Sequence, residues 1–184
     1  MIFIRGPIAG AVVIEPERRS DERGFFARSW CAQEFATQGL PMTIAQVNVA
    51  QTLRQGTVRG LHLQTPPHEE TKVVSCTRGA IFDVLVDLRP GSATFGRWFG
   101  VELGAADGRM LHVPAGCAHG YQALCDDVAI QYLASHPYAP AHATGLRFDD
   151  PEVGIAWPVP VTLVSAADRN WGTLAALRAA RAGR

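Results

Sequence analysis

The sequence has no excess of either charge, because its 184 residues contain 17 Lys plus Arg and 17 Asp plus Glu. No global field steers such a chain toward nucleic acid or an anionic membrane, and we expect neither as a partner. No apolar run reaches the length that crosses a membrane, and the N-terminus lacks the pattern of a secretory signal. We therefore expect a cytoplasmic location.

Cysteine is scarce. The four cysteines, at positions 31, 76, 117 and 125, form no C-x-x-C pair, and this excludes the usual spacing of a zinc knuckle or a dithiol redox motif. We expect reduced thiols that are mostly buried and pack as small apolar side chains.

Helical periodicity is also rare, and the prevailing period of the apolar residues is two. Short runs rich in Val and Ile are separated by Gly, Pro or Asp clusters, as is typical of β-strands. The expected strands cover residues 42–51, 72–76, 80–88, 110–113 and 128–133.

Two segments have a helical pattern. A short helix capped by Ser29 is expected to run through Phe35 and stop near Gly39, and residues 174–182 form an Ala/Leu/Arg run suited to a terminal helix. We predict an all-β fold, an antiparallel jelly roll or β-barrel with a few short helices. Residues 1–184 form one domain in this prediction, with 171–184 as a peripheral helix or tail.

Polar residues interrupt this pattern between Gly56 and Gln64, where Arg59 and His62 lie on an expected buried strand. Residues three apart in a plain strand point to opposite faces, but Gly60 permits a bulge that re-aims one side chain. A second histidine, His119, follows the Pro/Gly turn at 114–116. We expect the two histidines, from two strands, to converge in one cavity.

A metal site is the nearest physical alternative, because β-barrels of the cupin type bind iron, manganese or nickel through His and carboxylate ligands. Such a site usually needs a His-x-His pair, whereas here Gln64 stands two residues after His62. An amide oxygen is a poor substitute for imidazole toward a transition metal. We expect neither a metal nor another cofactor.

With these residues in view, the chain resembles the dTDP-4-dehydrorhamnose 3,5-epimerase family, a metal-free branch of the cupin jelly rolls, over roughly residues 1–170. The reaction that the resemblance implies inverts C3, C5 or both in a nucleotide-linked 4-keto-6-deoxy sugar, through an enolate. The matching segments, in order, are residues 21–26, 46–48, 58–62, 72–74, 83–89, 93–96, 114–120, 132–138, 149–151 and 165–168.

The resemblance implies three catalytic residues. His62 matches the general base, and Asp168 matches the carboxylate that holds this imidazole and stabilises its charged form. Tyr132 matches the proton donor on the opposite face of the sugar. An unperturbed imidazole, with a pKa of about 6.5, is largely neutral at cellular pH, and an unperturbed phenol, with a pKa of about 10, stays protonated.

The resemblance also implies residues that bind the charged parts of the substrate. Lys72 would place a cation beside the 4-keto oxygen, and His119 would donate a hydrogen bond to the same oxygen or to the diphosphate. Arg23 and Arg59 are matched to the diphosphate, because a guanidinium offers a fork of donors to phosphate oxygens.

The remaining matches concern the nucleoside. Gln46 and Asn48, two apart on a strand, share one face and can recognise hydroxyl or base edges. Phe26, or its neighbour Phe25, would stack or pack near the nucleobase. Tyr138 is a second candidate donor that would otherwise line the pocket or decide how many centres invert.

Four positions depart from the family pattern. Arg28 and Ala143 stand where the family often has glutamate, Ala167 where it often has lysine, and Leu63 where tyrosine is common. The catalytic set is therefore complete and the recognition set altered, so that the nucleobase and the number of inverted centres stay open. The alternatives are a 3-epimerase, a 3,4-ketoisomerase, a metal-dependent cupin oxygenase, and a sugar-binding protein without turnover.

The resemblance further implies a homodimer. The family is typically dimeric, with an N-terminal strand that contributes to the neighbour's sheet, and oligomerisation of this kind covers the strand edges that a jelly roll leaves open.

Overall fold

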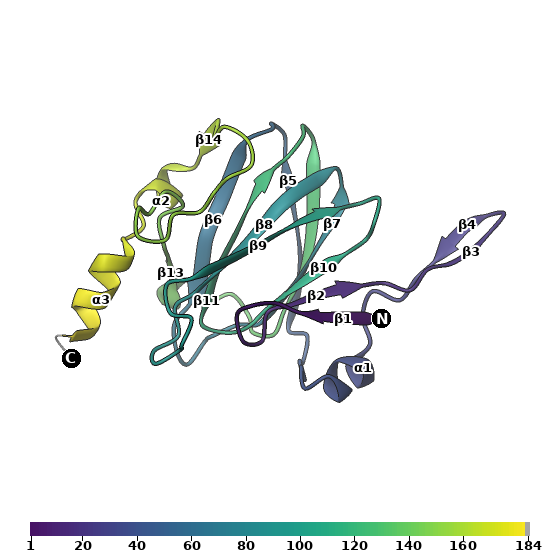
Figure 1. The fold of residues 1–184 in the computed structure, drawn as a ribbon, viewed down its shortest axis with the longest axis horizontal. Helices are drawn as coiled ribbons and strands as arrows, with labels where there is room; N and C mark the ends of the chain where they lie inside the picture. Colours follow the sequence, from purple (N-terminus) through teal and green to yellow (C-terminus); the bar gives the residue numbers. More distant parts are fainter. Residues whose placement is uncertain (183–184) are drawn as a thin grey trace.

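Two six-stranded sheets lie face to face in the computed structural model, which describes residues 1–182 (Figure 1). The first sheet contains, in spatial order, β1 (Ile2–Arg5), β2 (Val12–Glu15), β10 (Met110–Val113), β7 (Lys72–Arg78), β12 (Val128–Ala134) and β5 (Gln46–Thr52). The second contains β13 (Ala143–Gly145), β6 (Thr57–Gln64), β11 (Cys117–Ala123), β8 (Ala80–Asp87) and β9 (Trp98–Gly104), with β14 (Leu163–Val164) beside β6. Neighbours in these orders are antiparallel, and β14 runs parallel to β6. The predicted all-β jelly roll is confirmed.

Four of the five expected strands, seen as β7, β8, β10 and β12, keep their predicted starts and differ at their ends by at most two residues. The fifth, β5, begins at Gln46 and not at residue 42. The physical reason is its neighbour: β12 ends at Ala134, which pairs with Gln46, so residues 42–45 have no strand to pair with.

The helices are short. The predicted Ser29 cap is wrong, because α1 (Ala32–Thr37) begins after Cys31, whose side chain makes no capping bond. Trp30 packs on the buried Phe35 with ring centres 4.1 Å apart, which holds residue 30 outside the helix. The predicted terminal helix is confirmed as α3 (Leu174–Ala182). The four-residue α2 (Ala166–Arg169) and the 3-10 turn η1 (Pro140–His142) were not predicted.

The predicted bulge is present in β6. His62 pairs with His119 and Arg59 with Tyr121, so β6 has one residue more than β11 over this interval. Gly60 has a φ of 119°, and a Cβ there would lie 2.7 Å from the Cα of Gly120. Only glycine fits this crossing, and the extra residue lets both Arg59 and His62 reach one cavity.

The main apolar core lies between the sheets, and two smaller clusters cover their outer faces. Leu61, Leu146 and Leu174 belong to the cluster beneath the C-terminal segment, and Phe35 to the cluster beneath α1. Within residues 1–182, no helix combines the length and apolar character that a membrane span requires.

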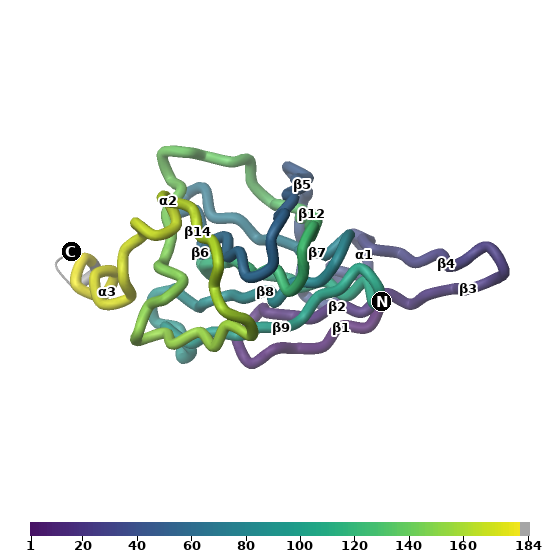
Figure 2. The backbone as a smooth tube through the Cα atoms, turned by 90° about the horizontal axis from the view of Figure 1, so that it is seen from above, coloured from purple at the N-terminus to yellow at the C-terminus, as the bar shows by residue number. Residues whose placement is uncertain are grey.

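A two-stranded hairpin of β3 (Arg19–Asp21) and β4 (Gly24–Phe26) stands apart from both sheets. Figure 2 shows it projecting from the barrel as a separate arm. Phe25 and Phe26 are 57% and 69% exposed, a large apolar surface for a soluble hairpin.

Candidate active site

Two adjoining cavities open between the sheets, with volumes of about 460 and 600 Å³. They share four of their lining residues, His62, Lys72, Tyr132 and Asp168. The smaller, which we term the first cavity, extends toward Arg59, His119 and Tyr121. The larger, the second cavity, extends toward Gln46, Asn48, Tyr138, Ala143, Ala167 and Trp171. The predicted catalytic residues therefore lie where the two cavities meet.

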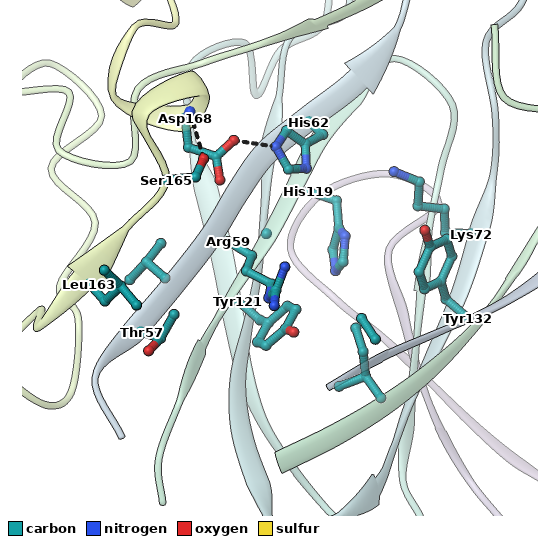
Figure 3. A pocket seen from close by; sticks show the side chains of 14 residues that line it. Thr57, Arg59, His62, Lys72, His119, Tyr121, Tyr132, Leu163, Ser165 and Asp168 are labelled. Carbon is teal, nitrogen blue, oxygen red and sulfur yellow. Dashed lines mark hydrogen bonds and ion pairs between the residues drawn. The ribbon is translucent and has the colours of Figure 1, made fainter. Parts of the chain in front are cut away.

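His62 and Asp168 form a hydrogen-bonded pair, with 2.6 Å between Nε2 and Oδ1 (Figure 3). The turn that precedes α2 fixes the carboxylate, because the Ser165 hydroxyl accepts a bond from the Asp168 N–H at 3.0 Å. The carboxylate also accepts bonds from the N–H of Gly60 at 3.2 Å and from the indole of Trp171 at 3.3 Å. Three donors, two from β6 and one from the residues after α2, thus hold Asp168 in one orientation.

These donors decide the charge of Asp168. Burial alone raises the pKa of this carboxyl, but the hydrogen bond and charge of His62 and the N–H of Gly60 outweigh it, so the pKa lies below its ordinary value. An ionised carboxylate only accepts hydrogen bonds, so the Nε2 of His62 is the donor. In the neutral form of this imidazole, the lone pair is therefore on Nδ1, where it can accept a proton from a substrate.

Tyr132 faces this pair from the other sheet. It belongs to β12 whereas His62 belongs to β6, and Figure 3 shows their side chains on opposite sides of the first cavity. Burial raises the pKa of the Tyr132 phenol, and the negative charge of Glu70 raises it further. The phenol therefore stays protonated at neutral pH and can donate a proton across the cavity.

Lys72 supplies a cation beside Tyr132. Its Nζ lies 6.0 Å from the centre of the Tyr132 ring and 3.0 Å from Oε1 of Glu70. The Lys72 and Glu70 side chains are only 11% and 12% exposed. The ion pair is thus shielded from water. The attraction between its two charges is therefore stronger than it would be at the protein surface.

Arg59 and His119 line the first cavity. The guanidinium of Arg59 donates to Oγ1 of Thr52 at 2.9 Å and to the carbonyl of Gln51 at 2.8 Å. His119 is buried, with its Nε2 2.8 Å from Oδ1 of Asp83. Both side chains are therefore fixed before any ligand arrives.

Gln46, Asn48 and Tyr138 line the second cavity, as expected of residues on one strand face and its neighbouring loop. The intervening Val47 points away and is 52% exposed. The Oε1 of Gln46 accepts a hydrogen bond from the N–H of Tyr138, which joins the loop to β5.

Arg23 and Phe26 do not reach either cavity of their own chain. Both lie on the projecting hairpin, where Arg23 is exposed and bonded to Asp21. Arg28 also lies outside both cavities and pairs with Glu34 of α1. Neither Arg23 nor Phe26 is thus placed to contact a substrate in the cavities of its own chain.

The other three departures from the family pattern, Leu63, Ala143 and Ala167, line the second cavity. Two positions that often carry opposite charges in the family thus meet here as alanines in one cavity. Their small side chains leave this part of the cavity wall apolar.

Sequence reasoning missed Glu70, Asp83 and Trp171. Glu70 precedes Lys72 by two residues and could have been placed on the same face. Asp83 interrupts the apolar run of β8, and a charged residue in a buried strand is itself a signal. Trp171 lies between α2 and α3, and nothing in the sequence around it indicates a place in the site.

In the part of the chain that the structure describes, no three His, Cys, Asp or Glu side chains are grouped so as to hold a metal ion. The two cavity histidines are instead each bonded to their own carboxylate, His62 to Asp168 and His119 to Asp83.

Comparison with known proteins identifies the family of the chain. Residues 5–176 match the family model described as dTDP-4-dehydrorhamnose 3,5-epimerase. A protein of that name from Sinorhizobium fredii is 42% identical over 164 residues, which cover 89% of this chain and 84% of the relative.

Two solved structures extend the comparison. The dTDP-4-dehydrorhamnose 3,5-epimerase from Bacillus anthracis with TDP and PPi bound superposes with a TM-score of 0.91 at 37% identity, over 94% of this chain and 99% of that chain. ChmJ, a 3'-monoepimerase from Streptomyces bikiniensis in complex with dTDP-quinovose, gives a TM-score of 0.89 at 38% identity, over 98% of this chain and 90% of that chain. The match spans nearly the whole chain in sequence and in structure, and the chain belongs to the dTDP-4-dehydrorhamnose 3,5-epimerase family.

Proposed function

We propose that this protein is an isomerase that inverts C3, C5 or both in a dTDP-linked 4-keto-6-deoxy sugar by proton transfer through an enolate. The observation that carries the proposal is the placement of the His62–Asp168 pair and Tyr132 on opposite sides of one cavity. Inversion at carbon needs a base on one face of the sugar and a proton donor on the other.

The reaction starts at a C–H bond beside the keto group. Nδ1 of His62 removes the proton. The electron pair of the C–H bond forms a C=C bond to C4, and the π pair of the ketone moves to the 4-oxygen, which gives the enolate. Asp168 stabilises the imidazolium that results. Lys72 offers a positive charge to the enolate oxygen, and His119 offers an N–H.

The second step restores the ketone with the opposite configuration. The phenol of Tyr132 gives its proton to the other face of the enolate carbon. The histidine then holds one proton too many and the tyrosine one too few, so exchange with solvent resets both. A solvent-derived proton thereby enters the product at each inverted centre.

The second cavity is the proposed site for the nucleotide. Two related structures hold TDP and PPi or dTDP-quinovose, and the second cavity has a volume of about 600 Å³ beside the catalytic residues. Gln46, Asn48 and Tyr138 would contact the nucleoside in this cavity. Arg59 lines the first cavity, so it would contact the diphosphate only where the two cavities meet.

A homodimer completes the site in this proposal. The exposed hairpin carries Arg23 and Phe26, and the edge strand β5 exposes Val47 and Val49 (52% and 74%) next to the second cavity. A hairpin that crosses to a partner's β5 would cover these valines and bring a guanidinium and an aromatic ring to the partner's nucleotide.

We also propose a cytoplasmic location and a single domain over residues 1–184. Cys31, Cys76, Cys117 and Cys125 carry free thiols, as is usual in a reducing compartment. The helix α3 packs its Leu174 into a cluster with strands of the second sheet, which supports its assignment to the same domain.

Incubation with dTDP-4-keto-6-deoxyglucose in heavy water tests the proposed function. Proton NMR should show deuterium at C3 and C5 for a double epimerase and at C3 alone for a 3-epimerase. A migrated carbonyl would identify a 3,4-ketoisomerase, and tight binding without exchange a sugar-binding protein. No deuterium at either carbon would overturn the proposal for this substrate, and loss of activity on chelation would indicate a metal-dependent enzyme.

A further inference from the structure

Four carboxylates are buried in the described part of the chain: Asp83, Asp87, Asp150 and Asp168. They differ in the number of hydrogen-bond donors that stabilise their negative charge. Asp87 accepts hydrogen bonds from the side chains of Arg89, Ser92 and Thr94. Asp150 accepts three bonds from the backbone N–H groups of Glu152, Val153 and Leu174. The charge of each of these two carboxylates is therefore shared among fixed structural donors.

Asp83 lacks such support. It is fully buried in β8, with Oδ1 2.8 Å from Nε2 of His119, and within residues 1–182 its Oδ2 atom has no hydrogen-bond partner. A buried carboxylate without a compensating charge is strongly unfavourable. Among the described residues, His119 is the one side chain that hydrogen-bonds Asp83, and it is therefore the group placed to balance the charge.

The other titratable groups around Asp83 are two neutral side chains and one cation that directs its hydrogen bonds to other residues. Tyr121 lies opposite Asp83 in the sheet, and burial raises the pKa of its phenol, with Asp83 contributing to the rise. Burial likewise raises the pKa of the Cys76 thiol on β7. Arg59 donates to Thr52 and Gln51.

The two carboxylate–histidine pairs of the cavity thus differ in one respect. Asp168 accepts hydrogen bonds from the N–H of Gly60 and the indole of Trp171 besides that from His62. These two donors stabilise its negative charge, so Asp168 depends less on a positive charge at His62. His62 is also 46% exposed in its side chain, whereas His119 is 8% exposed. A carboxylate–histidine pair is therefore suited to accepting a proton at His62 and to carrying a positive charge at His119.

We propose that Asp83 is a positioning residue that holds His119 as an imidazolium, with Nε2–H bonded to Asp83 and Nδ1–H available to the substrate's 4-oxygen. This inference rests on the proposed function and deepens it. Together with Lys72, His119 places two cations at the oxygen where the enolate charge develops, while His62 acts as the base.

The substitution Asp83→Asn tests whether Asp83 holds His119 in its charged form, because it keeps the shape of the side chain and removes its charge. We expect kcat to fall at least about tenfold with KM within about threefold, as for loss of an interaction made in the transition state. Nitrogen-15 NMR of the unliganded protein at pH 7 should show a doubly protonated His119 in the wild type and a neutral one in the variant.

Asp87→Asn is the matched control, since it makes the same change at a buried position of the same strand. It should lower stability and leave kcat and the His119 signal unchanged. In the background of His119→Gln, the Asp83 substitution should cause no further loss, because Asp83 acts through His119.

A neutral His119 in the wild type would overturn the inference, and this measurement needs no variant to fold. An unchanged kcat in Asp83→Asn, or losses that multiply in the double variant, would also overturn it. Failure of the proposed function is distinguishable, because it appears as absent deuterium exchange in the wild type, while the NMR signal still reports the state of His119.

Discussion

The Nε2 atom of His62 lies 2.6 Å from Oδ1 of Asp168, which is 106 positions later in the chain. This bond sets the tautomer of the imidazole and joins β6 to α2. The rest of the mechanism requires it, since a histidine with Nδ1 protonated cannot accept the substrate proton at that atom.

We therefore expect Asp168→Asn to lower kcat about 100-fold or more, because the amide no longer stabilises the imidazolium or fixes the tautomer. The rate of deuterium incorporation into the sugar measures the effect. Ser165→Ala is the comparison variant: it keeps the carboxylate and removes the capping bond to the Asp168 N–H, so it should cost about 1 kcal/mol of stability and lower kcat far less than Asp168→Asn does. Wild-type turnover in Asp168→Asn would contradict the assigned role.

Tyr132→Phe separates the two proton transfers. We expect deuterium to keep entering the sugar, because His62 can return a solvent proton to the face from which it took one. Inversion should fall about 100-fold or more, because the opposite face has lost its donor. NMR of the recovered sugar distinguishes exchange with retention from exchange with inversion.

Tyr138→Phe is the matched control, since Tyr138 is 65% exposed. Because Tyr138 is proposed to contact the nucleoside, the variant should leave both exchange and inversion near wild type at saturating substrate and change only KM. Normal inversion in Tyr132→Phe together with lost inversion in Tyr138→Phe would exchange the two roles.

Glu70→Gln should move the alkaline limit of activity to lower pH. Burial raises the pKa of Tyr132 and the charge of Glu70 raises it further. Removal of that charge lowers the pKa, so the phenol loses its proton, and with it its donor function, at a lower pH. The measurements are the pH profile of kcat and the tyrosinate absorbance, with Tyr132→Phe as the reference for the phenol.

Glu69→Gln is the control for this prediction, because Glu69 is an exposed neighbour that lines neither the first nor the second cavity. It should leave the profile unchanged. A profile that stays in place, or moves to higher pH, in Glu70→Gln would contradict the assigned influence of Glu70.

Mixed dimers test whether the hairpin serves the partner's site. We expect Arg23→Ala to raise KM and His62→Asn to abolish turnover when each is assayed alone. If Arg23 acts across the dimer, a mixture re-equilibrated into heterodimers regains activity, because one site combines an intact His62 with an intact Arg23 from the other chain. An absence of rescue, or a monomeric mass by light scattering at micromolar concentration, would contradict the arrangement.

The sequence by itself determined the strands and much of the site. Alternation of apolar residues marked β7, β8, β10 and β12, because side chains of a strand alternate between faces whatever the strand pairs with. Gly60 between Arg59 and His62 indicated the bulge, because the freedom of glycine is a local property. The motifs shared with the family pointed to His62, Tyr132 and Asp168, all of which line the cavities.

Only the tertiary structure decided which of these groups touch. The pairing of Asp83 with His119 and the separation of the Arg23 hairpin from its own cavity depend on how distant strands pack. The prediction of a helix cap at Ser29 was wrong because tertiary packing, here that of Trp30 on Phe35, fixed where α1 begins. Local preferences are weak compared with the burial of a large aromatic side chain, and burial is settled by the whole fold.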